Sequence, residues 1–242
     1  MQLITNSDMQ TTQVGNFAFS GIRPDKLGST EYTLVTIVTD KTGSVSSFAD
    51  GLLKMKQAVI GACKKSPRSD FLMFRSVEFN QSIVEEHGFM ELQAVDANAY
   101  QPPTCTGMTA LFDATYNAVA ATNEYAKILT NQDYSVNGIV FVVTDGDDNA
   151  SARNVKQVAD EVVRGVQNEW LESLNVVLIG VNAPNYQQEL EAFKTKAGLT
   201  QYVDIGDVTA QKLAKLANFV SRSISSQSQS LGTGGGSQAL VF

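Results

Sequence analysis

The chain has 242 residues, of which 43% are apolar and 18% charged, a composition typical of a globular protein with a core of full domain size. The formal net charge of −7 argues against binding of nucleic acid through a surface rich in lysine and arginine. Two cysteines, Cys63 and Cys105, are too few for a disulfide framework and lack the spacing of a zinc site, and Cys63 fits a buried thiol.

The chain begins with a polar, turn-rich stretch over residues 1–30, which we predict to be an N-terminal extension that packs on the main domain. It holds one short strand over 15–20. The N-terminus has no basic start followed by an apolar segment, so we expect no signal peptide. No apolar run is long enough to cross a bilayer. These features predict a cytoplasmic protein without a membrane partner, and the short chain suggests a microbial or phage source.

From residue 31 onward, β-branched apolar runs alternate with segments of helical periodicity. This alternation predicts one α/β domain over residues 31–225, with a doubly wound, mostly parallel central sheet flanked by helices. Residues 226–242 are rich in Gly, Ser and Gln and are predicted to form a flexible tail. The predicted strands cover 32–39, 71–79, 82–86, 89–92, 138–144, 174–180 and 202–204. The predicted helices cover 48–65, 110–130, 152–168, 186–197 and 208–224.

Two of the predicted strands end on an aspartate, Asp40 and Asp145. Ligands of an open α/β sheet bind beyond the carboxyl ends of its strands. If the two strands are neighbours, their carboxylates lie close together and repel each other unless a cation lies between them. Thr42 and Ser44 alternate with Asp40 in an extended segment, so the three side chains point to one side. Carboxylate and hydroxyl oxygens are hard ligands, suited to Mg²⁺, Mn²⁺ or Ca²⁺.

Each of these pieces has a simpler structural explanation when it is taken alone. Residues 40–44 fit a turn before a capped helix, residues 145–149 fit a polar turn, and Thr109 fits a helix cap. We interpret Asp147 and Asp148 as a solvated acidic turn, Lys41 as a surface residue and the single His87 as a turn residue without a role. The metal site is favoured because the pieces occur together, in order, at strand ends.

Together these residues resemble the von Willebrand factor type A family, whose metal-ion-dependent adhesion site has the pattern D-x-S-x-S, then a Thr, then an Asp after the fourth strand. The match extends to the stretch Gly-Met-Thr-Ala-Leu-Phe-Asp-Ala over 107–114 and to the Thr-Asp-Gly turn at 144–146. The resemblance covers about residues 32–225, and its one departure is a threonine at position 42, which keeps the hydroxyl. The matching residues are Asp40, Thr42, Ser44, Thr109 and Asp145.

The resemblance implies a Rossmann-like fold and one bound divalent cation, Mg²⁺ by default and otherwise Mn²⁺ or Ca²⁺. It also implies that Thr42 and Ser44 bind the metal directly, Thr109 directly or through water, and Asp40 and Asp145 mainly through water. The open coordination position would take an Asp or Glu carboxylate from a partner protein. We therefore expect a metal-dependent protein-interaction module for adhesion or assembly, and not an enzyme, with an oligomeric state that the sequence does not indicate.

Two alternatives remain open at the level of sequence. Residues 40–44, Asp-Lys-Thr-Gly-Ser, differ by one residue from the Asp-Lys-Thr-Gly-Thr phosphorylation loop of P-type ATPases, so a Mg²⁺-dependent phosphotransferase of haloacid-dehalogenase type would use Asp40 as its nucleophile. The stretch 107–114 has no counterpart in that family. The other alternative is a von Willebrand-type scaffold with an empty site. With one histidine and no glycine-rich phosphate loop, the sequence offers no other catalytic set.

Overall fold

The structure, a computed structural model, describes residues 8–234 and 240–242. The strands are β1 (Met9–Val14), β2 (Phe17–Ile22), β3 (Glu31–Asp40), β4 (Leu72–Phe79), β5 (Ile83–Glu91), β6 (Ser135–Thr144), β7 (Leu174–Gly180) and β8 (Gln201–Asp204). The helices longer than two turns are α1 (Ala49–Cys63), α2 (Leu111–Thr130), α3 (Val155–Gln167), α4 (Gln187–Lys196) and α5 (Ala210–Thr233).

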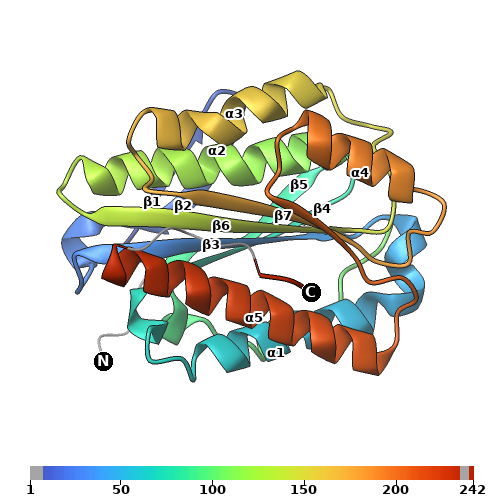
Figure 1. The fold of residues 1–242 in the computed structure, drawn as a ribbon, viewed down its shortest axis with the longest axis horizontal. Coiled ribbons are helices and arrows are strands. Elements are labelled where there is room, and N and C mark those ends of the chain that lie inside the picture. Colours follow the sequence, from blue (N-terminus) through green and yellow to red (C-terminus); the bar gives the residue numbers. More distant parts are fainter. Residues whose placement is uncertain (1–7, 235–239) are drawn as a thin grey trace.

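The strands form one eight-stranded sheet in the order β1-β2-β5-β4-β3-β6-β7-β8. Strands β4, β3, β6, β7 and β8 run parallel, while β5 is antiparallel to β4 and β1 is antiparallel to β2. Helices α1 and α5 cover one face of the sheet, and α2, α3 and α4 cover the other (Figure 1). The predicted doubly wound, mostly parallel α/β fold is confirmed.

The central strands were recognisable because both of their faces are buried. In β3, Val35 and Ile37 belong to the core beneath α1 and α5, whereas Leu34 and Val38 belong to cores on the opposite face. A strand without a solvent-facing side has a nearly continuous apolar sequence, as doubly covered parallel strands do. Cys63 at the end of α1 is 1% exposed, which confirms its interpretation as a buried thiol.

The N-terminal edge of the sheet differs from the prediction of one short strand. Two strands, β1 and β2, form a hairpin there, and its turn includes Gly15, whose φ of +56° is a conformation that glycine adopts without strain. The hairpin joins the rest of the sheet where Gly21 of β2 pairs with Phe89 of β5. The prediction of two short strands over 82–86 and 89–92 is wrong, because β5 runs through both as one strand.

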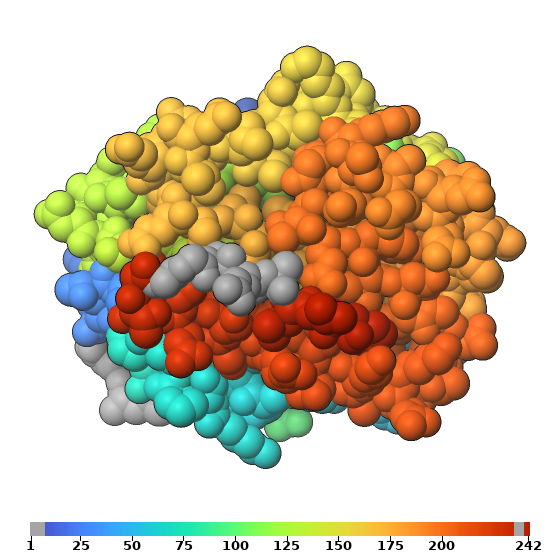
Figure 2. All heavy atoms as spheres, viewed as in Figure 1, coloured from blue at the N-terminus to red at the C-terminus, as the bar shows by residue number. Residues whose placement is uncertain are grey.

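The last helix also extends further than predicted. We expected it to end at 224 and to lead into a flexible tail, but α5 continues to Thr233, so the tail prediction is wrong over 226–233. Gln227 is buried and donates hydrogen bonds to the Gly138 carbonyl and to Ser173, which anchors these turns to the sheet. At the C-terminus the ring of Phe242 contacts Phe219 edge-on at 5.6 Å, and Figure 2 shows the final residues (dark red) lying against α5.

Residues 1–7 of the predicted N-terminal extension and residues 235–239 of the predicted tail lie outside the described residues. No helix in the described ranges has both the length and the apolar character needed to span a bilayer.

Candidate metal centre

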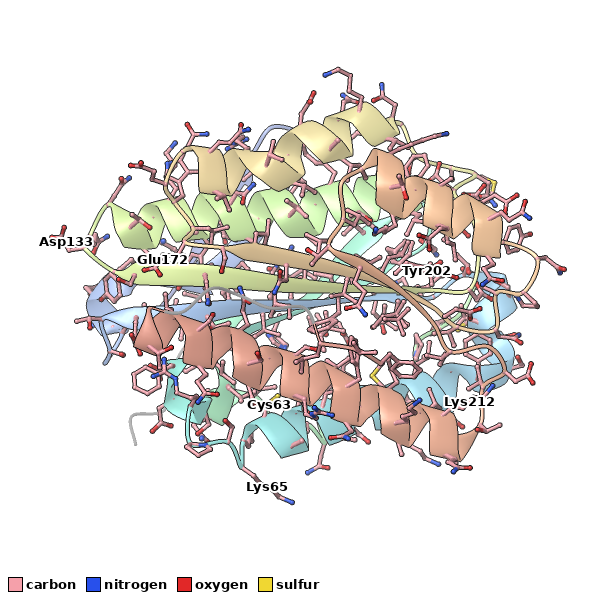
Figure 3. All side chains as sticks on the ribbon, in the orientation of Figure 1. Cys63, Lys65, Asp133, Glu172, Tyr202 and Lys212 are labelled. Atoms are coloured by element: carbon pink, nitrogen blue, oxygen red, sulfur yellow. The ribbon has the colours of Figure 1, made fainter. Side chains whose placement is uncertain are left out.

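The carboxyl ends of β3 and β6 bring the two predicted aspartates to one edge of the sheet. The strands pair in parallel as far as Thr39 and Val143, so Asp40 and Asp145 leave the sheet side by side. In Figure 3, Asp133, which precedes β6, lies at the opposite end of the molecule from Lys212, near the start of α5. The carboxyl ends of the parallel strands are on the Lys212 side, where ligands of this fold class bind.

A chain of hydrogen bonds connects four of the five predicted metal residues. The backbone N–H of Thr42 donates to Asp40 Oδ1 at 2.7 Å. The hydroxyls of Thr42 and Ser44 lie 3.0 Å apart, and Ser44 Oγ donates to Asp145 Oδ1 at 3.0 Å. These bonds bring the hydroxyls of Thr42 and Ser44 together with the Asp145 carboxylate, and the Thr42 backbone links the Asp40 carboxylate to them. Their role as ligands stays a prediction.

Asp40 is fully buried and both of its carboxylate oxygens are occupied. Oδ1 accepts the Thr42 N–H, and Oδ2 accepts the Thr144 hydroxyl at 2.7 Å. Burial raises the pKa of Asp40, and these hydrogen bonds oppose the rise. An aspartate that forms a phosphoenzyme must direct a free oxygen at its substrate, so this geometry disfavours the phosphotransferase alternative.

Asp145 carries the clearest electrostatic signature of the site. Its side chain is 6% exposed, and burial, followed by the nearby charge of Asp40, raises its pKa to about 6. Lys41, the residue after Asp40, is paired with Glu78 at 3.6 Å, and its side chain is largely covered, whereas the sequence predicted a surface residue. Two buried carboxylates, one of which has its pKa raised by the charge of the other, form a site that a cation would stabilise.

The donor chemistry fits a hard divalent cation. Within residues 8–234 and 240–242, no group of three or more His, Cys, Asp or Glu side chains is placed to hold a metal ion. A metal at this edge would therefore need hydroxyl ligands beside the two carboxylates. Oxygen-only sets of this kind suit Mg²⁺, Mn²⁺ or Ca²⁺ and are poor for softer metals.

Thr109 is tied to the loop that follows Asp145. Its N–H donates to Asn149 Oδ1 at 2.8 Å, and its carbonyl accepts the N–H groups of Asn149 and Ala150. The preceding Gly107 has a φ of +85°, the left-handed conformation that favours glycine. These bonds set the position of the fifth predicted residue relative to Asp145 through Asn149, which the sequence analysis did not single out.

Asp148 and His87 have other roles than the sequence suggested. Asp148 Oδ1 accepts the N–H of Phe112 at 3.2 Å and the hydroxyl of Ser151 at 2.5 Å, so it caps the first turn of α2 and is not a solvated acid. His87 lies within β5 and not in a turn. Its ring stacks on Phe74, and its Nε2 pairs with the Tyr100 hydroxyl.

Replacing Thr144 by valine should weaken the site without leaving a cavity. The substitution removes the hydroxyl that binds Asp40 Oδ2, and a lost hydrogen bond to a buried charged group costs about 2 kcal/mol. We expect this loss of unfolding free energy in urea, and a Mn²⁺ affinity lower by about tenfold. Thr39→Val is the matched control, because the buried Thr39 hydroxyl finds no hydrogen-bond partner within the described chain. An equal cost for both substitutions would contradict this account.

No protein-family model and no curated protein sequence matches the chain. Solved structures do match it, and three of them are described here. A D319A mutant of the PilB minor pilin from Streptococcus sanguinis aligns with a TM-score of 0.60 and 15% identity over 93% of this chain and 68% of that one. The pilus adhesin SpaC from Lactobacillus rhamnosus GG aligns with a TM-score of 0.59 and 9% identity over 90% of this chain and 35% of that one.

The third is proximal thread matrix protein 1 from the mussel byssus, in a structure with a zinc-occupied MIDAS motif. It aligns with a TM-score of 0.53 and 18% identity over 80% of this chain and 46% of that one. This chain thus spans about two thirds of the pilin, about a third of the adhesin and less than half of the matrix protein. At these identities the matches establish a shared fold, which this chain has in common with a pilin, an adhesin and a matrix protein.

Proposed function

We propose that this chain is a von Willebrand factor type A interaction module. It holds one divalent cation, Mg²⁺ by default, and uses that cation to bind an Asp or Glu carboxylate of a partner protein. The observation that carries the proposal is the convergence of two buried, mutually repelling carboxylates, Asp40 and Asp145, with the hydroxyls of Thr42 and Ser44. In this proposal Thr109, whose N–H donates to Asn149 in the loop after Asp145, is the fifth residue of the set.

The residues divide into neutral ligands and charged supports. Thr42 and Ser44 offer neutral hydroxyl oxygens to the cation, and Thr109 offers a third. Asp145 accepts the Ser44 hydroxyl, and Asp40 is held in place by the Thr42 N–H and by Thr144. When bound, the cation supplies a Lewis-acidic position for an incoming carboxylate. Because neutral oxygens leave most of its positive charge uncompensated, this ligand set favours an anionic partner group.

The classes of protein among the structural neighbours support this proposal. A minor pilin, a pilus adhesin and a byssus matrix protein are proteins of attachment and assembly, and one of them carries a zinc-occupied MIDAS motif. We keep Mg²⁺ as the proposed metal because the ligands of this chain are all oxygens. We also propose, as the sequence suggested, that the module works in the cytoplasm.

Isothermal calorimetry with MnCl₂ and MgCl₂ tests the proposal directly. We expect one ion per chain for the wild-type protein and an affinity weaker by at least about tenfold for Ser44→Ala, which removes a ligand hydroxyl. Ser46→Ala is the matched control, because Ser46 is exposed in the same loop and lies outside the ligand set. Absence of binding to the wild-type protein would overturn the proposal, as would turnover of acetyl phosphate that is lost on Asp40→Asn.

A further inference from the structure

Strand β1 forms an edge of the sheet, and its outer side is open within the described residues. It stands first in the strand order, with β2 on its inner side and no described strand beyond it. Its six residues, Met-Gln-Thr-Thr-Gln-Val, include no charge and no proline, and its register with β2 has no bulge. Charge, proline, a bulge or very short length normally protects an edge strand against pairing with another chain. None of these protections is present in β1.

The opposite edge of the same sheet is protected. Strand β8 has four residues, against six in β1, and it ends on an exposed acid, Asp204. A strand this short offers few backbone groups to another chain, and its charge disfavours pairing with a second copy. The two edges therefore differ in the way expected if β1 pairs with another chain and β8 does not.

The geometry of the hairpin determines which backbone groups of β1 point outward. Two residues separate Val14 from Phe17, and the closing pair of such a hairpin exchanges hydrogen bonds. Bonded pairs recur at every second residue of an antiparallel ladder, so Thr12 and Gln10 also bond to β2. The backbone N–H and carbonyl groups that point outward are those of Met9, Thr11 and Gln13.

Two hydrogen bonds at the hairpin agree with this alternation. The N–H of Arg23 donates to the carbonyl of Asp8 at 2.8 Å, which continues the series of even-numbered residues that bond on the β2 side. Ser20 lies opposite Thr11, but its N–H donates to Glu85 on β5 at 2.9 Å and so points away from β1. The outward direction of the Thr11 backbone therefore rests on observed contacts as well as on the turn.

We propose that β1 pairs with β1 of a second copy of this chain, antiparallel and about a two-fold axis at Thr11. Thr11 then lies opposite its own copy, and Met9 lies opposite Gln13 of the partner subunit. Each of these bonded pairs exchanges two hydrogen bonds, so all the outward N–H and carbonyl groups of β1 find partners. The strand carries no charge, so no like charges meet within this pairing although each chain has a net charge of −7.

The dimer holds its two candidate metal centres at opposite ends of one continuous sheet. Antiparallel pairing of β1 reverses the direction of every strand in the second copy. The carboxyl ends of its parallel strands, where Asp40 and Asp145 lie, therefore point the other way. The pairing itself does not depend on a bound metal. Together with the proposed metal-dependent binding, it makes a module that links two partner proteins.

Sedimentation and amide hydrogen exchange of the full chain in EDTA test the pairing. We expect an average mass that rises with protein concentration toward twice that of one chain, because an edge of six residues supplies a small, reversible interface. Over the same series the amides of Thr11 and Gln13 should exchange at least about tenfold more slowly in the dimer. The amides of Gln10 and Thr12, which bond to β2, should be protected at every concentration.

Charges at position 11 test the two-fold axis. Thr11 is exposed, so Thr11→Lys and Thr11→Glu should fold as the wild-type protein does. Each variant places like charges opposite one another in the dimer, which should raise its dissociation constant about tenfold. An equimolar mixture should form a mixed dimer tighter than either variant alone, because opposite charges then face each other. Gln201→Lys, on the other edge strand, is the matched control and should dimerise as the wild-type protein does.

Several outcomes would overturn the proposal. These are the mass of one chain at every concentration, a dimer that Thr11→Lys leaves unchanged, and charge variants that do not associate in the mixture. Protection of the outward amides in a monomer would contradict it too, because another part of the same chain would then cover the edge. Protection that appears only when a different protein is added would assign the edge to that partner and not to a second copy. Since every measurement is made in EDTA, failure of the pairing leaves the proposed metal-dependent function untouched.

Discussion

Replacing Asp145 by asparagine is expected to remove most of the divalent-metal affinity and, at the same time, to stabilise the metal-free protein. The asparagine keeps an oxygen for the Ser44 hydroxyl but loses one of the two charges that attract the cation. At an effective dielectric constant near 20 such a charge contributes about 3 kcal/mol, which corresponds to an affinity loss of about a hundredfold.

In the metal-free protein the same substitution should raise the free energy of unfolding, because there is no bound cation whose attraction to Asp145 would be lost. Burial and the charge of Asp40 raise the pKa of Asp145 to about 6, which means that the ionised form is disfavoured in the folded protein. A neutral asparagine removes this penalty at neutral pH, and we expect a gain on the order of 1 kcal/mol in unfolding free energy.

Thermal unfolding in EDTA and in MgCl₂ measures both effects in one series. The wild-type protein should melt higher in MgCl₂, because a ligand that binds only the folded state stabilises it by mass action. Asp145→Asn should melt higher than wild type in EDTA and show almost no response to MgCl₂. Asp147→Asn, two positions along the same loop, is the matched control and should keep the wild-type response. A destabilised Asp145→Asn in EDTA would contradict the repulsion between the two carboxylates.

The sequence predicted those parts of the fold whose signal is local. Strand β3 is buried on both faces, so its apolar β-branched run is evident without any knowledge of its neighbours. Strand β1 was missed because it is a polar edge strand whose pairing with β2 comes from the turn at Gly15. The last turns of α5 were missed because serine and glutamine there resemble a linker, whereas Gln227 forms hydrogen bonds with Gly138 and Ser173 that only the folded chain provides.

In the candidate site, too, the features with a local sequence signal were predicted and those that depend on contacts between loops were not. Alternation was enough to predict that Asp40, Thr42 and Ser44 lie near one another, and the strand-end position was enough to bring Asp145 to them. The predicted extended segment is wrong in its second half, because Ser44 lies in a 3-10 helix over Gly43–Phe48. The roles of Thr144 and Asn149 were not predicted, although both are polar residues close to Asp145 in sequence. Their roles depend on hydrogen bonds that cross between loops, to Asp40 and to Thr109, and no periodicity encodes such contacts.

The stabilisation that Mg²⁺ gives should disappear as the pH falls through about 6. In the metal-free protein the pKa of Asp145 is raised to about 6, whereas the metal site needs this carboxylate ionised. Below that pH each bound ion must displace a proton, so the affinity should fall by about tenfold for each further pH unit. Melting temperatures with and without MgCl₂, measured between about pH 7 and about pH 5, follow this loss.

The stability of the metal-free protein must change in the other direction over the same range. A carboxyl group whose folded-state pKa is raised favours folding when it is protonated, so its contribution is present below the unfolded-state pKa and is lost as the pH rises through about 6. His87, whose pKa is lowered by burial, affects the protein equally with and without metal and cancels in the difference between the two melts. Asp145→Asn lacks this carboxylate but keeps Asp40, whose pKa is also raised by burial, so its difference should be small across the whole pH range. If the wild-type difference were as large at about pH 5 as at about pH 7, the metal would not be competing with a proton on Asp145, and the carboxylate could not be part of the site.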